Sequence, residues 1–94
     1  MIITSFLAFV IVQSAQTKPR LALPDANTAV SVAEVLLGRR YGQAHIRAER
    51  PFTAKLNNGV WLVEGTLPGR ALGGVASMKL RASDCQVLEM IHGK

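Results

Sequence analysis

The chain has 94 residues, of which 49% are hydrophobic and 18% are charged. This composition is typical of one small folded domain, and it excludes a disordered chain and a large substrate cavity. Eleven Lys and Arg against six Asp and Glu give a net charge of +5, but the basic residues are scattered along the chain. Nucleic-acid-binding proteins carry their basic residues together on one face, interleaved with aromatic residues that stack on the bases. The scattered basic residues of this chain do not fit that pattern, so we expect no nucleic-acid partner.

The chain begins with an apolar run from Ile2 to Val12, followed by small and polar residues. A run of this length predicts a signal peptide at 1–15, and hence a periplasmic or secreted protein. A membrane span takes about 20 apolar residues, so we expect no stable membrane anchor. An extended entry segment at 16–24 and one domain at 25–94 would follow. Cys85 is the single cysteine, which leaves no internal disulfide in an oxidising compartment.

A helix is predicted to begin after Asp25 or Asn27, because either residue can cap it. Apolar residues then recur at helical spacing as far as Tyr41, and Gly42 is the residue type expected at the end of a helix. A short second helical turn is predicted from Gln43 to Glu49. Pro51 disfavours helix at the preceding residue and favours extended structure beyond it.

Four strands are predicted after Pro51, at Phe52–Leu56, Val60–Leu67, Val75–Leu80 and Val87–His92. Asn57-Asn58-Gly59 favours a tight hairpin because Asn and Gly tolerate positive φ. The fold class is therefore α+β: one N-terminal helix and a short helical turn packed on a four-stranded antiparallel meander. The meander would bury six residues, namely Trp61, Val63, Met78, Leu80, Leu88 and Met90.

The titratable residues show no spacing that builds a metal site or pairs a nucleophile with a base. We therefore expect no catalytic residues, no metal, no cofactor and no enzymatic activity. His45 is interpreted as a solvent-facing residue and His92 as a frayed residue near the end of the chain. Candidate partner-binding residues are Arg50, Glu64, Arg70 and His92; the two arginines are included because Arg is favoured at binding hot spots.

Several short motifs together resemble bacterial immunity proteins of the nuclear transport factor 2 fold. They are Tyr41-Gly42, Arg50-Pro51-Phe52, Gly59 to Pro68, Gly73-Gly74-Val75-Ala76 and His92-Gly93-Lys94. The resemblance implies a cone-like, cystatin-like domain with a curved sheet that neutralises a bacterial toxin by binding it. One departure is Cys85, which stands where the family pattern has Gly.

A second resemblance, to small periplasmic inhibitory domains of the PepSY type, lacks the Arg-Pro-Phe and His-Gly-Lys matches. A small enzyme on the same cone fold is a third alternative, disfavoured by the lack of a paired acid and base. We therefore expect an exported binding protein that masks a protein partner, such as a cognate toxin, through its sheet face or the loop 69–74. A homodimer is a further candidate assembly.

Overall fold

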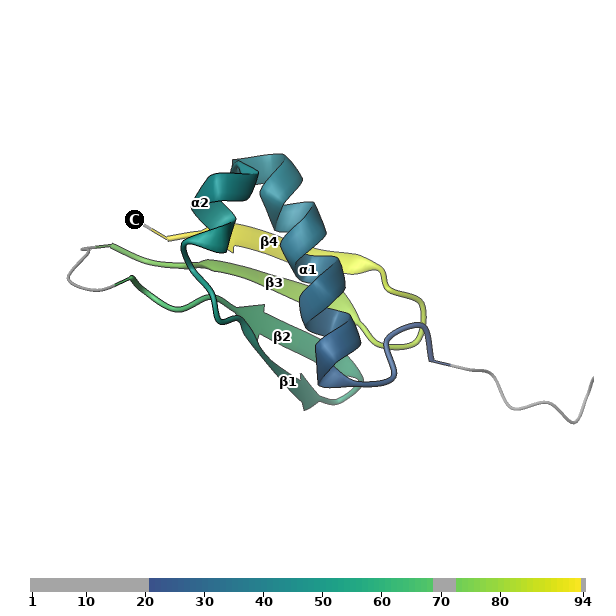
Figure 1. The fold of residues 1–94 in the computed structure, drawn as a ribbon. Helices are drawn as coiled ribbons and strands as arrows, with labels where there is room; N and C mark the ends of the chain where they lie inside the picture. Colours follow the sequence, from purple (N-terminus) through teal and green to yellow (C-terminus); the bar gives the residue numbers. More distant parts are fainter. Residues whose placement is uncertain (1–20, 69–72, 94) are drawn as a thin grey trace, which may run out of the picture.

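The structure is a computed structural model that describes residues 21–68 and 73–93. The predicted signal peptide and Arg70 lie outside the described residues. The elements are α1 (Ala26–Tyr41), α2 (Gln43–Arg47), β1 (Thr53–Asn57), β2 (Val60–Glu64), β3 (Ala76–Arg81) and β4 (Val87–His92). The strands form one antiparallel sheet in the order β1-β2-β3-β4, and α1 lies across one face of it (Figure 1). The predicted α+β meander is therefore confirmed.

Helix α1 has the predicted start and end. The Asp25 carboxylate accepts a hydrogen bond from the Thr28 N–H at 2.8 Å, and Gly42 at φ 102° donates its N–H to the Gly38 carbonyl. The buried face of the helix carries Ala29, Ala33 and Leu37. Two of these three side chains are small, so the helix backbone can lie close to the sheet.

Both hairpin turns contain residues with positive φ, but the β1–β2 turn is short and the β3–β4 turn is longer. Asn58 and Gly59 both have positive φ, as the Asn-Gly signal predicted. In the β3–β4 turn, Cys85 takes φ 62°, the left-handed conformation that favours glycine. Next to this turn, the register between β3 and β4 shifts at Lys79/Leu80, and Leu88 is 44% exposed. The prediction that Leu88 is a core residue is wrong, because the bulge breaks the alternation that would have turned it inward.

Strand β2 ends three residues earlier than the sequence predicted. The chain leaves the sheet after Glu64, and Thr66 donates its N–H to the Glu49 carbonyl at 2.7 Å. The Thr66 hydroxyl also donates to the Pro51 carbonyl at 2.7 Å. These bonds replace the strand ladder and tie the end of β2 to the segment that follows α2.

The core lies between α1 and the sheet, with Leu37, Val63, Met78 and Leu80 fully buried. Trp61 closes one end of it and donates its indole N–H to the Leu23 carbonyl at 2.9 Å. Leu23 belongs to the predicted entry segment, yet its side chain is buried in this core. Among the described residues, no helix is long and apolar enough to cross a membrane.

Candidate functional site

Glu49 is the one buried charged residue in the part of the chain that the structure describes. It lies in the turn after α2, with its side chain only 4% exposed. Its Oε1 accepts the Ala76 backbone N–H at 2.7 Å, at the start of β3. Burying a carboxylate costs free energy unless it is paired or hydrogen-bonded, and buried ionisable groups are common at functional sites. The surroundings of Glu49 are therefore the candidate site.

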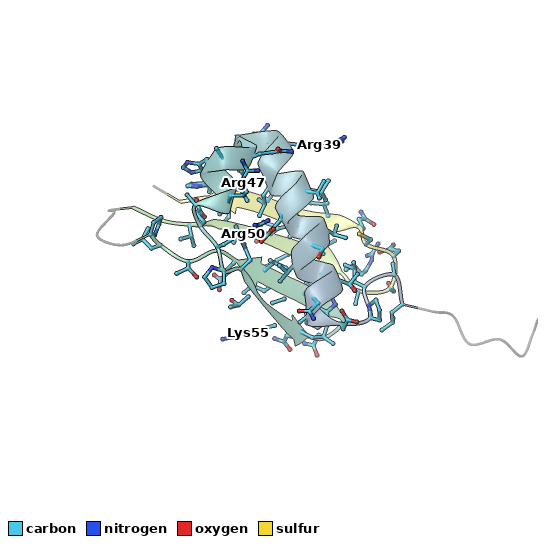
Figure 2. The ribbon with its side chains drawn as sticks, viewed as in Figure 1. Arg39, Arg47, Arg50 and Lys55 are labelled. Atoms are coloured by element: carbon cyan, nitrogen blue, oxygen red, sulfur yellow. The ribbon has the colours of Figure 1, made fainter. Side chains whose placement is uncertain are left out.

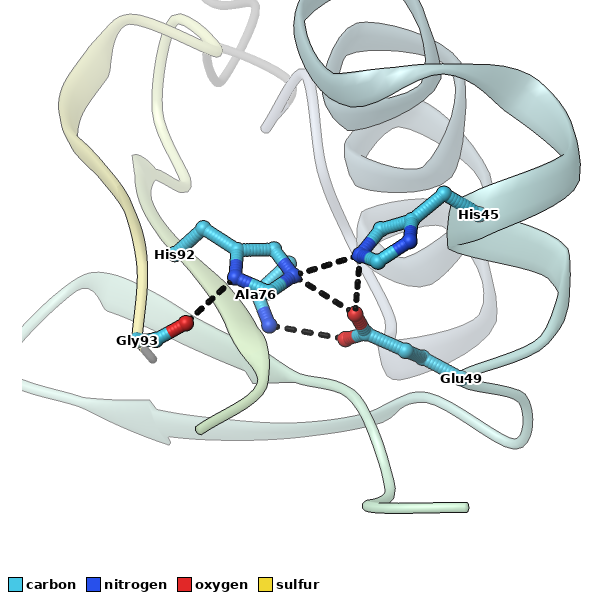
Figure 3. A network of polar contacts seen from close by, with 5 residues as sticks. All are labelled: His45, Glu49, Ala76, His92 and Gly93. Carbon is cyan, nitrogen blue, oxygen red and sulfur yellow. Dashed lines mark hydrogen bonds and ion pairs between the residues drawn. The ribbon is translucent and has the colours of Figure 1, made fainter. Parts of the chain in front are cut away.

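Two histidines meet the free oxygen of this carboxylate (Figure 3). His92 Nε2, from the end of β4, lies 2.7 Å from Glu49 Oε2, and His45 Nε2, from α2, lies 3.2 Å from the same oxygen. The two Nε2 atoms are 2.9 Å apart. The His45 side chain is 56% exposed and that of His92 is 19% exposed. Three ligand-type atoms therefore converge at one end of the sheet, with access from solvent.

Glycines make room for this arrangement. A Cβ on Gly65 would lie 2.8 Å from Glu49 Oε1 and 3.0 Å from Phe52, so a side chain there would displace the carboxylate. A Cβ on Gly93 would lie 2.9 Å from the Gly74 Cα, where the end of β4 approaches the chain leading into β3. The motifs that carry the family resemblance thus converge on Glu49, although they are far apart in the sequence.

The His92 ring is fixed by its second nitrogen. His92 Nδ1 donates to the Gly93 carbonyl, with the two atoms 2.6 Å apart. This bond raises the pKa of His92 above its ordinary value of 6.5; partial burial opposes the rise and the Glu49 carboxylate reinforces it. The Tyr41 ring packs beside His92 with 5.2 Å between ring centroids. His92 is therefore held in one orientation from both sides.

Sequence reasoning missed this cluster. The interpretation of His92 as a frayed residue is wrong, because its ring is largely buried and contacts Glu49. His45 is exposed as expected, but it shares the Glu49 oxygen with His92. The sequence analysis disfavoured an enzyme because it found no paired acid and base. Glu49 and His92 form such a pair, so that argument does not hold. The one available sequence signal was the i, i+4 spacing of His45 and Glu49.

The other candidate residues lie elsewhere. Arg50 comes from the segment after α2 (Figure 2) and donates to both carboxylate oxygens of Glu34 on α1, the shortest contact being 2.8 Å. This ion pair raises the pKa of Arg50 through hydrogen bonding and charge, and it ties the segment to α1. Glu64 is exposed on the sheet face opposite α1, paired in register with Thr53 and Ser77. Arg70 lies outside the described residues.

The sheet face opposite α1 is open. A shallow groove on it is lined by apolar and basic side chains, among them Lys55, Val60, Leu62, Lys79 and Leu88. Ile91 on β4 is also half exposed. Lys79 pairs with Glu89 at 3.4 Å, both being about half exposed. Mixed apolar and basic side chains on an unpartnered sheet suit a contact with another protein.

Comparison with known proteins identifies a matching family and a relative. A family model described as "NTF2 fold immunity protein", the nuclear transport factor 2 fold, matches residues 28–94. The "Uncharacterized protein YhhH" of Escherichia coli (strain K12) is 33% identical over 67 residues, which cover 70% of this chain and 53% of that protein. The chain therefore spans about half the length of this curated relative. No solved structure matches the chain.

Proposed function

Because this chain belongs to the family of NTF2 fold immunity proteins, we propose that it neutralises a bacterial protein toxin by binding it. The family match over residues 28–94 is the observation that carries this proposal, and it favours the immunity function over an inhibitory domain of the PepSY type. The protein would act by masking its partner, without turnover. Its exposed basic and apolar side chains support such a role.

The contact surface that we propose is the open sheet face, defined here by Lys55, Val60, Leu62, Lys79 and Leu88. Because α1 covers the opposite face, these side chains project from the fold without serving its core. The chain's net charge of +5 favours a toxin whose binding surface is acidic. Glu64 lies on the same face and would contribute at its edge.

Growth protection tests this proposal. The genes that neighbour this chain's gene are first screened for one that encodes a large secreted protein. Such a toxin candidate is co-expressed with the chain, and growth is measured together with co-purification of the pair. A charge is introduced into the open sheet face by Leu88→Glu. The matched control is Val35→Glu, because Val35 is 58% exposed on the outer side of α1, away from this face.

We expect the wild type and Val35→Glu to restore growth and to co-purify with the toxin, whereas Leu88→Glu does neither while remaining folded. Equal protection by all three proteins would move the contact away from the open sheet face. Turnover of a small molecule that is abolished by Glu49→Gln, with no toxin bound, would overturn the binding function in favour of an enzyme.

Export is a separate proposal supported by the sequence alone. The apolar run from Ile2 to Val12 has signal-peptide length, so we propose that 1–15 are removed and that the domain acts in the periplasm or outside the cell. Mass spectrometry of the protein recovered from the periplasm measures this directly. A recovered mass that still includes Met1 would contradict it.

A further inference from the structure

We propose that His45, Glu49 and His92 form a binding site for a divalent transition metal, with Zn²⁺ as the best-fitting ion. The ligand atoms are His45 Nε2, Glu49 Oε2 and His92 Nε2, which lie within 4.8 Å of one another. This site is on the helix-covered side of the sheet, so it is independent of the proposed toxin contact on the open sheet face.

Hydrogen bonds alone cannot satisfy all three contacts among these ligand atoms. The three atoms form a triangle with sides of 2.7, 2.9 and 3.2 Å, each short enough for a hydrogen bond. Each Nε2 carries at most one hydrogen, and an ionised carboxylate carries none. If both rings donate to Glu49, their two N–H groups face each other and the contact between the rings is unfavourable. If only one ring donates to Glu49, the other two contacts have no hydrogen bond. A cation between the three atoms makes all three contacts favourable at once.

The spacing fits a tetrahedral ion. Zinc binds His nitrogen at about 2.0–2.1 Å and carboxylate oxygen at about 2.0–2.2 Å, so neighbouring ligand atoms in a tetrahedral site lie about 3.3 Å apart. The observed separations of 2.7–3.2 Å would widen by about 0.1–0.6 Å to reach that value. Two His and one Glu leave a fourth position for water or for a ligand from another molecule.

Two of the proposed ligands, His92 and Glu49, each use their second polar atom in a hydrogen bond that orients the ligand atom, as metal sites require. His92 Nδ1 donates to the Gly93 carbonyl, which leaves the lone pair of the neutral ring on Nε2, facing Glu49. Glu49 Oε1 accepts the Ala76 N–H, which directs Oε2 toward the two rings. Such outer hydrogen bonds orient metal ligands and fix the tautomer of a ligating His. The exposed His45 completes the site and admits the ion.

A bound ion would link three separate segments: α2, the turn that follows it, and the end of β4. Figure 3 shows these segments meeting at the cluster. Because metal binding to a folded site adds to folding stability, the ion would hold the end of β4 against the helical layer. The site would thus fasten the strand end that the sequence analysis interpreted as frayed.

Titration calorimetry with ZnCl₂ on the purified, untagged, chelator-treated protein tests the site. His45→Gln removes one ligand from an exposed position, where the fold depends little on it. Cys85→Ser is the matched control, because Cys85 is the chain's one thiol and zinc binds thiolates well. We expect one ion per chain in the wild type and in Cys85→Ser. Loss of an outer partner alone weakens binding by about 10–100-fold, so His45→Gln should weaken it by about 100-fold or more.

Spectroscopy gives a readout that does not depend on a variant. The chain has two His residues, so nitrogen NMR of the wild type can assign both rings. Zinc should shift Nε2 of both rings and leave the His92 Nδ1–H in place, and Co²⁺ should give a four-coordinate visible spectrum without a thiolate band. Absence of saturable binding, equal affinity in His45→Gln, coordination through Cys85, or ring signals that zinc leaves unchanged would each overturn the proposal.

Discussion

The two ends of the helix-covered sheet face differ in chemistry: one is packed with apolar side chains and the other with polar groups. At one end, Trp61 fills the space beside Leu23 and Leu80, and its one polar atom is bonded to a backbone carbonyl. At the other end, the same layer closes over a carboxylate, two imidazoles and glycines. The apolar end is explained by stability alone. The polar end is not, because apolar packing would serve stability at least as well as a buried charge.

The largest expected effect is at the apolar end. Trp61→Ala should lower the free energy of unfolding by about 3–5 kcal/mol, since it removes a large buried ring from a small core. Trp61→Phe should cost less, because it keeps one aromatic ring in the core, although it loses the volume of the second ring and the hydrogen bond to Leu23. Urea unfolding measures both. Leu88→Ala on the open sheet face is the control and should change stability by about 0.5 kcal/mol or less. A Trp61→Ala protein as stable as this control would contradict the assigned core.

Gly65→Ala tests how tightly the polar end is packed. The new methyl group would lie 2.8 Å from Glu49 Oε1, so we expect overpacking to cost about 1–3 kcal/mol in unfolding free energy. The same substitution in a Glu49→Ala background should cost less, because the 2.8 Å contact with Oε1 is gone, while the 3.0 Å contacts with the Cβ of residue 49 and with Phe52 remain. Equal costs in the two backgrounds would show that Glu49 does not pack against Gly65.

A smaller effect is expected from pH in the metal-free protein. The pKa of His92 is raised in the folded state, chiefly by the Gly93 carbonyl, from an ordinary value of 6.5. The protonated ring therefore contributes stability that is fully present below pH 6.5 and is lost as pH rises through the higher folded pKa. Unfolding measured across this window should show stability falling with rising pH. His92→Gln should flatten the profile, and an unchanged profile would contradict the ring's contacts.

The smallest expected effect lies outside both ends, in the β3–β4 turn. Cys85 has φ 62°, a conformation that costs a residue with a side chain about 1 kcal/mol. Cys85→Gly should therefore raise the unfolding free energy by up to about 1 kcal/mol, whereas Cys85→Ser keeps the strain and should not. Thermal unfolding of the two variants makes the comparison. A less stable Cys85→Gly protein would mean that the thiol's packing on the core outweighs the backbone strain.

The elements themselves were predictable because their signals are local. Asp25 and Gly42 fix the ends of α1 through hydrogen bonds to residues three or four positions away, and Asn58-Gly59 makes the first hairpin turn through its own backbone preferences. The prediction failed at Leu88, where a bulge shifts the register of β4. It also failed at the end of β2, where Thr66 bonds to Glu49 instead of continuing the strand.

The sequence by itself thus determined a small α+β domain, its helix, its meander and its family resemblance, since these depend on spacing and turn chemistry within short stretches. Only the tertiary structure decided that Glu49 is buried and that His45 and His92 share its oxygen. These side chains come from α2, the turn after it and the far end of β4. The i, i+4 spacing places His45 near Glu49, but no local pattern records that His92 meets them when the helical layer folds onto the last strand of the sheet.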